Sequence, residues 1–254
     1  MGGLLNSMIA IIPARGGSKG LPGKNVKELD GIPLIAHTIK AAIGASCVDR
    51  VIVTTDDRGI AGIAEQYGAE VPFLRPEALA TDTASAVDVY IHAVNFLVER
   101  DGADLKKFMV LLPTVPFRNS RHIDEAFELF SQSDCETLIS VRRADVPPSW
   151  YLKVGENGYL HSCGFGMESG VLRNRQDDGG YCIPNGAIYI LDFDILVKER
   201  TYYTDKTVAY VMRESDSVDI DTYDDFCYAE YIRSKVNIEN GSCHGGIPGC
   251  HKIF

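Results

Sequence analysis

Residues 9–25 read Ile9-Ala10-Ile11-Ile12-Pro13-Ala14-Arg15-Gly16-Gly17-Ser18-Lys19-Gly20-Leu21-Pro22-Gly23-Lys24-Asn25. The stretch begins as an apolar run typical of a buried β-strand and continues as a glycine-rich loop whose only charges are positive. Glycine lets backbone N–H groups approach an anion closely, and Arg15, Lys19 and Lys24 add positive charge for phosphate oxygens. The segment therefore predicts a phosphate-binding loop after a strand, which favours nucleotide chemistry over an ordinary strand-to-helix turn.

The spacing of the glycines excludes the two commonest phosphate-binding motifs. They do not follow the dinucleotide pattern G-x-G-x-x-G, and Gly23-Lys24 lacks the earlier glycine that a P-loop requires. The chain is acidic, with 35 Asp and Glu against 25 Lys and Arg and a net charge of -10. Because the first carboxylate is Glu28, the loop is a basic island, while the overall charge argues against a nucleic-acid surface.

Length and composition fit one α/β domain, since the chain has 254 residues of which 45% are hydrophobic. Strand-like runs are expected at 9–12, 50–54, 71–73, 108–112 and 137–141. Helical patterns lie between them at 34–43, 58–67, 85–100 and 121–130, the last after a candidate cap at Ser120. This alternation predicts a Rossmann-like, mostly parallel sheet with helices on both faces. Ligands bind such sheets beyond the carboxyl ends of the strands, where the basic loop would lie.

The regular alternation stops after residue 141. Pro147-Pro148 and the turn candidate Glu156-Asn157-Gly158 predict a β-hairpin that leaves the main sheet. Strands are expected again at 186–191 and 207–213, and a closing helix at 223–236. We therefore divide the chain into a nucleotide-binding and catalytic domain, residues 1–141 and 185–236, an extension, residues 142–184, and a weakly structured tail, residues 237–254.

The seven cysteines are scattered without the spacing of a disulfide framework, which is typical of reduced thiols in a reducing compartment. The apolar N-terminal stretch is too short to span a membrane and lacks the features of a signal peptide. A cytoplasmic protein is expected. In the tail, Cys243-His244 and Cys250-His251 leave a metal site as an alternative to a frayed end.

Acidic residues gather between Glu214 and Asp225. Asp219 and Asp221 are two positions apart, so an extended backbone would place both carboxylates on one face, where they could hold Mg²⁺. A solvated strand end, or a helix cap at Asp221-Thr222, explains the same pattern without a metal. The basic loop elsewhere in the chain makes a metal between the two segments plausible.

Four separated motifs carry a resemblance to a known family. They are Ile12-Pro13-Ala14-Arg15-Gly16-Gly17-Ser18-Lys19-Gly20-Leu21-Pro22-Gly23-Lys24-Asn25, Arg75-Pro76-Glu77-Ala78-Leu79-Ala80-Thr81-Asp82-Thr83-Ala84-Ser85, Pro184-Asn185-Gly186-Ala187-Ile188-Tyr189 and Ser217-Val218-Asp219-Ile220-Asp221-Thr222. In this order the chain resembles the CMP-sialic acid synthetases, or acylneuraminate cytidylyltransferases. The resemblance implies the nucleotide-diphospho-sugar transferase type of fold and covers nearly the whole chain.

The resemblance also implies roles for individual residues. The expected nucleotide-binding residues are Ala14, Arg15, Ser18, Lys24, Asn25, Arg75, Thr83, Ala84 and Ser85. The expected sugar-binding residues are Leu112, Thr114, Arg175, Asn185 and Tyr189. Asp219 and Asp221 would hold Mg²⁺ or Mn²⁺ and, with Arg15 and Lys24, carry the catalysis. Thr83 or Ser85 could instead cap a helix, and Arg173 and Arg175 could belong to a solvated loop.

The implied reaction transfers CMP from CTP to the anomeric hydroxyl of a nine-carbon keto sugar acid and releases pyrophosphate. The resemblance further implies a homodimer in which the extension of one subunit reaches the sugar site of the other, with neither nucleic acid nor membrane as a partner. A CMP-Kdo-type enzyme, another sugar nucleotidyltransferase and a non-catalytic nucleotide-binding module remain as alternatives.

One segment departs from the family pattern. Leu112 stands where sialic-acid enzymes usually place glutamine, and Val115 replaces a common serine. Loss of these polar groups predicts a more apolar pocket wall. The departure favours a related nonulosonate, such as legionaminic or pseudaminic acid, over N-acetylneuraminate.

Overall fold

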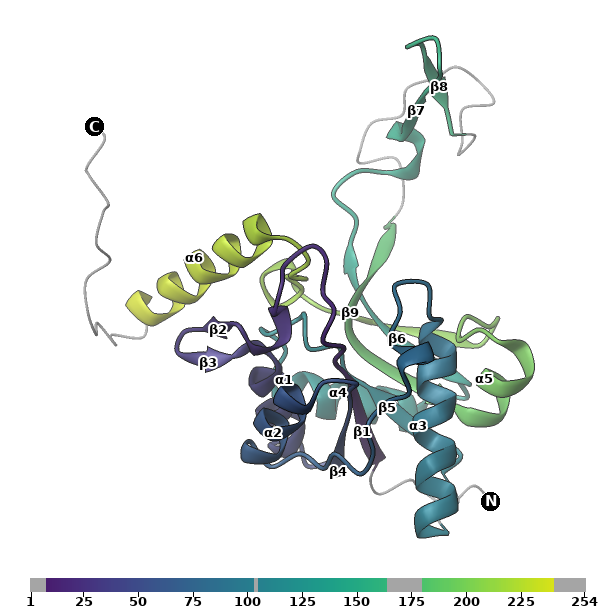
Figure 1. Cartoon of the computed structure of the whole chain (residues 1–254). Coiled ribbons are helices and arrows are strands. Elements are labelled where there is room, and N and C mark those ends of the chain that lie inside the picture. Colours follow the sequence, from purple (N-terminus) through teal and green to yellow (C-terminus); the bar gives the residue numbers. More distant parts are fainter. Residues whose placement is uncertain (1–7, 103–104, 164–179, 240–254) are drawn as a thin grey trace.

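The computed structural model describes residues 8–102, 105–163 and 180–239 (Figure 1). Its centre is a six-stranded sheet in the order β10-β6-β9-β5-β1-β4. The strands are β1 (Met8–Pro13), β4 (Val48–Thr54), β5 (Lys107–Val110), β6 (Thr137–Arg143), β9 (Cys182–Asp192) and β10 (Thr207–Val211). β1 runs parallel to β4 and β5, and β10 runs parallel to β6. β9 is antiparallel to both neighbours, β5 and β6, so the sheet is mixed.

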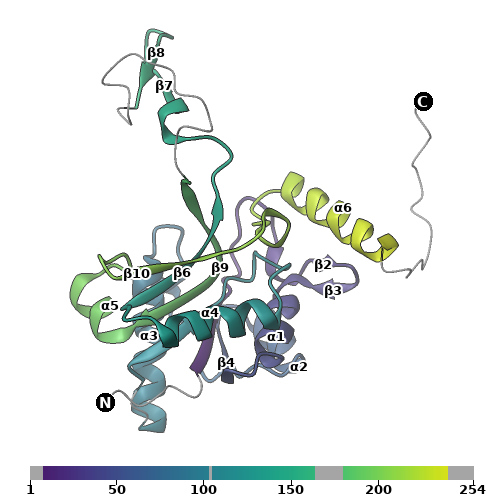
Figure 2. The ribbon, with the colours of Figure 1, turned by 180° about the vertical axis from the view of Figure 1, so that it is seen from behind.

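Helices cover both faces of this sheet, as the two opposite views show (Figures 1 and 2). One face carries α1 (Leu34–Ile43), α2 (Arg58–Gln66) and α4 (Ser120–Gln132). The other carries α3 (Ala86–Asp101) and α5 (Phe193–Glu199). α6 (Tyr223–Glu239) packs at the edge of the domain, near a small hairpin of β2 (Glu28–Leu29) and β3 (Ile32–Pro33).

The core explains why the strand runs are continuously apolar. Successive side chains of β1 point to opposite faces, so Ala10 and Ile12 pack with the α1 side while Ile9 and Ile11 pack with the α3 side. A strand covered on both faces needs apolar residues at every position. Because β1 ends at Pro13, the loop that follows it begins at the carboxyl edge of the sheet.

A break in the pairing of β6 with β9 shapes the same edge. The register shifts between Ile139 and Val141, opposite residues 185–188 of β9. The Ser140 hydroxyl accepts a hydrogen bond from Ile188 N at 2.7 Å and donates one to Asn185 Oδ1 at 2.6 Å. Asn185 Nδ2 in turn donates to Ser217 Oγ at 2.8 Å. These buried side-chain bonds replace the missing backbone bonds and tie β9 to the segment that carries Asp219 and Asp221.

Most of the expected elements are confirmed. The structure has a mostly parallel sheet with helices on both faces, and a hairpin of β7 (Leu152–Val154) and β8 (Leu160–Ser162) at the expected turn. The expected strand at 71–73 is wrong: only isolated bridges join Ile52 to Glu70 and Thr55 to Leu74. Pro72 has no N–H to donate to a ladder. The cap of α4 is Asn119 rather than Ser120.

The β7–β8 hairpin stands away from the domain, and every residue of its two strands is exposed (Figure 1). We call the described residues 144–163, with Gly180 and Tyr181, the arm. It joins the sheet where Arg143 of β6 pairs with Cys182 of β9. In the described part of the chain, no helix has the length and apolar character needed to cross a membrane. The tail pairs at Cys243 and Cys250 lie outside the described residues.

Buried contacts hold α6 against the domain. His37 of α1 lies 2.9 Å from the Leu29 carbonyl through Nε2, and its Nδ1 lies 3.1 Å from Arg233 Nη2. The Arg233 guanidinium also lies over the ring of Phe117. Because Nδ1 must accept from the guanidinium, this geometry requires a neutral imidazole. In agreement with a neutral ring, the pKa of His37 is lowered, mainly because the side chain is buried.

We predict that the free energy of unfolding falls as the pH is lowered from 7.5 to 5.5. The folded protein holds a proton on His37 less tightly than the unfolded chain, so below about pH 6.5 the unfolded state binds more protons and gains stability. Burial lowers the pKa of His92 and His122 in the same sense. Urea unfolding across this range should show a shallower pH slope for His37→Asn than for the native chain. Substitution of the exposed His161 is the control, and an unchanged slope in His37→Asn would contradict the assignment.

Candidate active site

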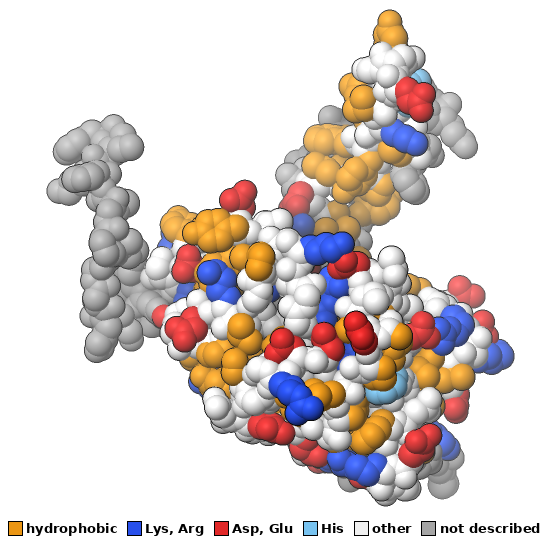
Figure 3. Space-filling model, in the orientation of Figure 1, with side chains coloured by type: hydrophobic (Ala, Val, Ile, Leu, Met, Phe, Trp, Pro, Cys, Tyr) orange, Lys and Arg blue, Asp and Glu red, His pale blue; other side chains and the backbone are white. Residues whose placement is uncertain are grey.

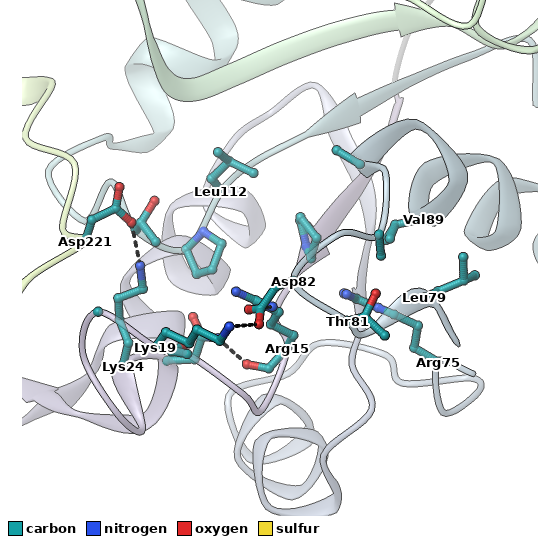
Figure 4. A pocket seen from close by; sticks show the side chains of 18 of the residues that line it. Arg15, Lys19, Lys24, Arg75, Leu79, Thr81, Asp82, Val89, Leu112 and Asp221 are labelled. Atoms are coloured by element: carbon teal, nitrogen blue, oxygen red, sulfur yellow. Dashed lines mark hydrogen bonds and ion pairs between the residues drawn. The ribbon is translucent and has the colours of Figure 1, made fainter. Parts of the chain in front are cut away.

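A cavity of about 550 Å³ opens at the carboxyl edge of the sheet (Figure 4). The loop after β1 forms one side, the segment before α3 forms a second, and residues after β5 form the floor. Its lining residues include Arg15, Ser18, Lys19, Gly20, Lys24, Asn25, Arg75, Leu79, Thr81, Asp82, Ala84, Val89, Tyr90, Leu112, Thr114, Tyr189, Tyr202, Asp221 and Thr222. The cavity thus brings together residues from all four sequence motifs.

The shape of the basic loop is fixed by its own backbone and by neighbouring acids. Gly16 N donates to Asp56 Oδ1 at 3.0 Å, and the Asn25 side chain donates to the Arg15 carbonyl at 2.9 Å. Gly23 has a positive φ of 67°, which an L-residue adopts only with strain. The buried Asn25 amide leaves its Oδ1 without a hydrogen-bond partner among the described residues. The loop is therefore held in one shape with its cations at the cavity.

Two distant segments meet where Lys24 contacts Asp221. Lys24 Nζ lies 2.8 Å from Asp221 Oδ1, with the lysine side chain only 12% exposed and the carboxylate 71% exposed. The loop approaches so closely that a Cβ added to Gly20 would lie 2.4 Å from the Asp221 carbonyl oxygen. Only glycine permits this approach, so the basic loop and the Ser217–Thr222 motif form one wall of the cavity.

Asp219 has a perturbed acidity. Its backbone neighbour Ile220 donates to the Thr114 carbonyl at 2.9 Å, which holds the segment against the residues after β5. Part of the Asp219 carboxyl remains open to water, yet the surrounding protein desolvates it and raises its pKa. The charge of Asp221 acts in the same direction, while the Thr114 hydrogen bond and the charge of Lys24 oppose it. A cation beside these two carboxylates would relieve that cost.

Arg75 occupies a structural position at the cavity edge. Its guanidinium donates to Thr54 Oγ1 and to the Thr54 carbonyl at the end of β4. Desolvation lowers the pKa of this guanidinium, which is 6% exposed. The loop that follows, residues 80–85, brings Thr81, Asp82 and Ala84 to the cavity. Ser85 stands at the N-cap of α3 but its side chain makes no capping hydrogen bond.

The far end of the cavity is apolar and aromatic. Leu112, Tyr189 and Tyr202 line it, and the two tyrosine rings meet edge to face with centroids 5.5 Å apart. The Leu112 carbonyl accepts hydrogen bonds from Thr38 and from the buried Arg118, which also donates to the Ala187 carbonyl. Arg118 thereby joins the Leu112 backbone, after the end of β5, to β9.

Ten of the expected site residues line the cavity. They are Arg15, Ser18, Lys24, Asn25, Arg75, Ala84, Leu112, Thr114, Tyr189 and Asp221. Four others lie nearby without being on its wall: Ala14, Thr83, Ser85 and Asp219. Asn185 is buried in the network with Ser140 and Ser217, which gives it a structural role in this arrangement. Val115 is fully buried and packs in the core, so it is not part of the pocket wall as expected. Arg175 lies outside the described residues.

Several residues of the cavity were not expected from the sequence. Asp82 contacts both Arg15 and Lys19, although it was quoted only as part of a motif. Leu79 also lies in that motif without a role being expected for it, and Tyr90 and Tyr202 have no signal beyond hydrophobicity. Tyr202 comes from the segment between α5 and β10, a region that sequence patterning left unassigned. Thr222, considered as a helix cap, exchanges hydrogen bonds with Asp225 at the start of α6 and also lines the cavity.

Comparison with known proteins places this site in a family. A family described as Cytidylyltransferase matches residues 9–143, more than half of the chain. The chain belongs to the cytidylyltransferase family. This match covers the basic loop, Arg75, the 80–85 loop and the residues after β5, and it confirms the resemblance seen in the sequence.

Individual relatives agree with this assignment. The CMP-N,N'-diacetyllegionaminic acid synthase of Legionella pneumophila is 36% identical over 89% of this chain and 95% of its own length. The N-acylneuraminate cytidylyltransferase of Streptococcus agalactiae serotype V is 38% identical over 87% of this chain, which spans 52% of that longer protein. A CMP:2-keto-3-deoxy-manno-octonic acid synthetase complexed with CTP matches the fold with a TM-score of 0.66 at 16% identity, covering 91% of this chain and 99% of that one. The structural likeness shows the fold of a nucleotidyltransferase.

We predict that Gly20→Ala destabilises the loop and weakens CTP binding. The added Cβ would overlap the Asp221 carbonyl, so the two segments must separate at a cost of about 1–3 kcal/mol. Gly17→Ala in the same loop is the control, because its Cβ meets no atom within 4 Å. Its free energy of unfolding should change by less than about 0.5 kcal/mol. Urea unfolding and CTP titration would measure both, and equal behaviour of the two variants would disprove the close approach.

Proposed function

We propose that this chain transfers CMP from CTP to the anomeric hydroxyl of a nonulosonic acid, releasing pyrophosphate. The observation that carries the proposal is the meeting of the basic loop with the Asp219–Asp221 segment across one cavity. The apolar and aromatic far end of the same cavity supplies a place for a sugar acid. The names of the Legionella and Streptococcus relatives support this substrate class.

The loop would act by binding and orienting the triphosphate. Arg15, Lys19 and Lys24 present cations to the cavity, and the backbone N–H groups of the glycine-rich turn add donors. In an in-line displacement, negative charge grows on the leaving pyrophosphate, and Arg15 and Lys24 are placed to stabilise it. The chain would thus accelerate the reaction mainly by positioning and by charge, with little covalent chemistry of its own.

The two carboxylates fit a divalent cation. Asp219 carries a raised pKa because it is desolvated beside Asp221, and a cation would stabilise both charged forms. Among the described residues, no group of three or more His, Cys, Asp or Glu side chains is placed to hold a metal ion. Mg²⁺ is commonly held by one or two carboxylates, with substrate phosphates and water as its other ligands. We propose that Asp219 and Asp221 hold Mg²⁺ or Mn²⁺, which when bound would neutralise phosphate charge and acidify the attacking hydroxyl.

The sugar end favours an acid with fewer hydroxyl groups than N-acetylneuraminate. Leu112 lines the cavity with an apolar side chain that cannot hydrogen-bond, and Tyr189 and Tyr202 present aromatic surface. A hydroxyl placed against this wall would lose its hydrogen bonds to water, whereas a deoxygenated or acylated carbon would not. We therefore propose a legionaminic- or pseudaminic-type acid as the preferred substrate.

The deciding experiment measures pyrophosphate release from CTP with N-acetylneuraminic, legionaminic, pseudaminic and Kdo acids in parallel. We expect turnover with a nonulosonate and least with Kdo. Asp221→Asn should reduce kcat/KM by about a hundredfold or more, because a metal ligand is lost, and urea unfolding of the variant would measure the separate effect of losing the ion pair with Lys24.

Asp224→Asn is the matched control, since Asp224 is an exposed acid of the same segment outside the cavity. Mn²⁺ titration in the presence of CTP gives a readout that does not depend on turnover. Mn²⁺ should bind Asp221→Asn more weakly than Asp224→Asn. CTP binding with no pyrophosphate release for any acid would instead favour a non-catalytic nucleotide-binding module.

We propose that the chain forms a homodimer through the arm. A two-stranded hairpin in water is marginally stable, yet this one exposes Leu152, Val154, Tyr159 and Leu160, each at least 49% accessible. Figure 3 shows hydrophobic side chains gathered along this projection. Trp150, Tyr151 and Tyr181 extend the same surface toward its base.

We also propose a cytoplasmic location, which the free thiols Cys47, Cys135, Cys163, Cys182 and Cys227 support.

Light scattering after size-exclusion chromatography should give a mass twice the 27.9 kDa of one chain. Replacing both Val154 and Leu160 with lysine should shift the protein to the monomer, because it places charge on the exposed apolar face. Val197→Lys adds charge at an exposed apolar position of α5 and should leave the mass unchanged. A native chain that stays monomeric at micromolar concentration would exclude the arm as a dimer interface.

A further inference from the structure

Asp82 lies between two cations of the basic loop. Its Oδ1 is 2.7 Å from Arg15 Nη1, and its Oδ2 forms an ion pair with Lys19 Nζ. Each carboxylate oxygen therefore contacts one cation, and Figure 4 shows Asp82 beside Arg15 and Lys19. Asp82 belongs to the 80–85 loop, whereas Arg15 and Lys19 belong to the loop after β1. The contact bridges two separate walls of the cavity.

The carboxylate makes the kind of contact that a phosphate group would make. Carboxylate and phosphate oxygens accept the same charge-assisted hydrogen bonds from guanidinium and ammonium groups. The hydrogen bonds from Lys19 and then from Arg15 lower the pKa of Asp82, so it is ionised at neutral pH. An anion entering between these cations would meet the negative charge of Asp82 and would take the space that its carboxylate occupies.

The other cations of the cavity have different partners. Lys24 pairs with Asp221, and the Arg75 guanidinium is bonded to Thr54. Among the described residues, the ion pairs of the Arg15 and Lys19 side chains are those with Asp82. Asp82 is therefore the acidic partner that Arg15 and Lys19 have before a ligand binds.

We propose that Asp82 is an affinity-setting residue whose carboxylate competes with nucleotide phosphates for Arg15 and Lys19. The proposal rests on the proposed function, in which the loop receives a triphosphate and later releases pyrophosphate. Binding separates Asp82 from the two cations, and release lets it pair with them again. Asp82 thus weakens the binding of CTP and pyrophosphate and favours pyrophosphate release.

The competition also involves the loop on which Asp82 lies. Thr81 and Ala84 flank Asp82, close a turn through the Ala84 N–H and the Thr81 carbonyl, and line the same cavity. The turn therefore places the Asp82 carboxylate beside residues that line the same cavity as Arg15 and Lys19.

Calorimetric titration with inorganic pyrophosphate, in buffer free of divalent metal, tests this directly. Asp82→Asn keeps the side-chain shape but removes the competing charge, and it should lower the Kd for pyrophosphate by about two- to tenfold. The gain should shrink as KCl is raised, because salt screens exposed charges. Glu77→Gln is the matched control: it removes the same charge from an exposed neighbour that does not line the cavity, and its Kd should stay near the native value.

A double-variant comparison separates competition from a general change in charge. In the native chain, Asp82 already compensates the charge of Lys19, so Lys19→Gln should weaken pyrophosphate binding only slightly. In the Asp82→Asn background the same substitution should weaken binding more, because Lys19 is then free to be bound. Equal effects of Lys19→Gln in the two backgrounds would overturn direct competition.

Two further outcomes would reject the proposal. Weaker pyrophosphate binding by Asp82→Asn would mean that Asp82 holds the cations in place for the ligand. If neither the native chain nor the variant binds pyrophosphate, the basic loop is not a phosphate site. These results are distinct from failure of the proposed function, since a chain that binds pyrophosphate as expected but turns over no sugar acid would reject only the reaction.

Discussion

Mutual repulsion among cations is the constraint on which this site depends. Arg15, Lys19, Lys24 and Arg75 all reach one cavity. Like charges held so close disfavour the folded state unless acceptors compensate them. The fold supplies Asp82, Asp221 and the end of β4 for this purpose, and each comes from a different segment. The charge balance of the cavity therefore also fixes the relative positions of these segments.

Backbone geometry makes this charge balance possible. The sheet places the loop after β1 beside the segment before α6, but the charged groups meet only because Gly20 has no side chain where the Asp221 backbone passes. Asn185 accepts a buried hydrogen bond from Ser140 and donates one to Ser217, and these bonds hold the acidic segment from behind. A polar network in the core thus supports an electrostatic contact at the surface, even though no member of that network lines the cavity.

Much of the fold could be predicted from sequence because it follows from periodicity. The two-sided burial of β1 gives a continuous apolar run, and α1 begins directly after Pro33. That the basic loop and Asp221 line one cavity could also be expected, because cations and carboxylates in separate motifs suggested a shared site. The position of Asp82 could not be predicted in this way, because a single carboxylate in a loop belongs to no repeating pattern. Its contacts are with two cations more than sixty residues away in the sequence.

Other features were hidden for related physical reasons. The short run at 71–73 has strand-like residues, but whether it forms a ladder depends on N–H groups that Pro72 does not have. The antiparallel course of β9 and its irregular pairing near Ser140 depend on contacts between distant strands. Tyr202 reaches the cavity because of where the segment after α5 crosses, which no local pattern specifies.

The arm leaves the sheet and returns to it at neighbouring positions, since Arg143 and Cys182 are paired across β6 and β9. The sheet itself already holds the two ends together, so the chain between them needs little further loop-closure entropy, and this cost grows only slowly with length. Residues can be inserted into or deleted from the arm without altering the register of the strands below. A change in the length of the arm therefore leaves the strands below it, and the cavity at their carboxyl edge, in place.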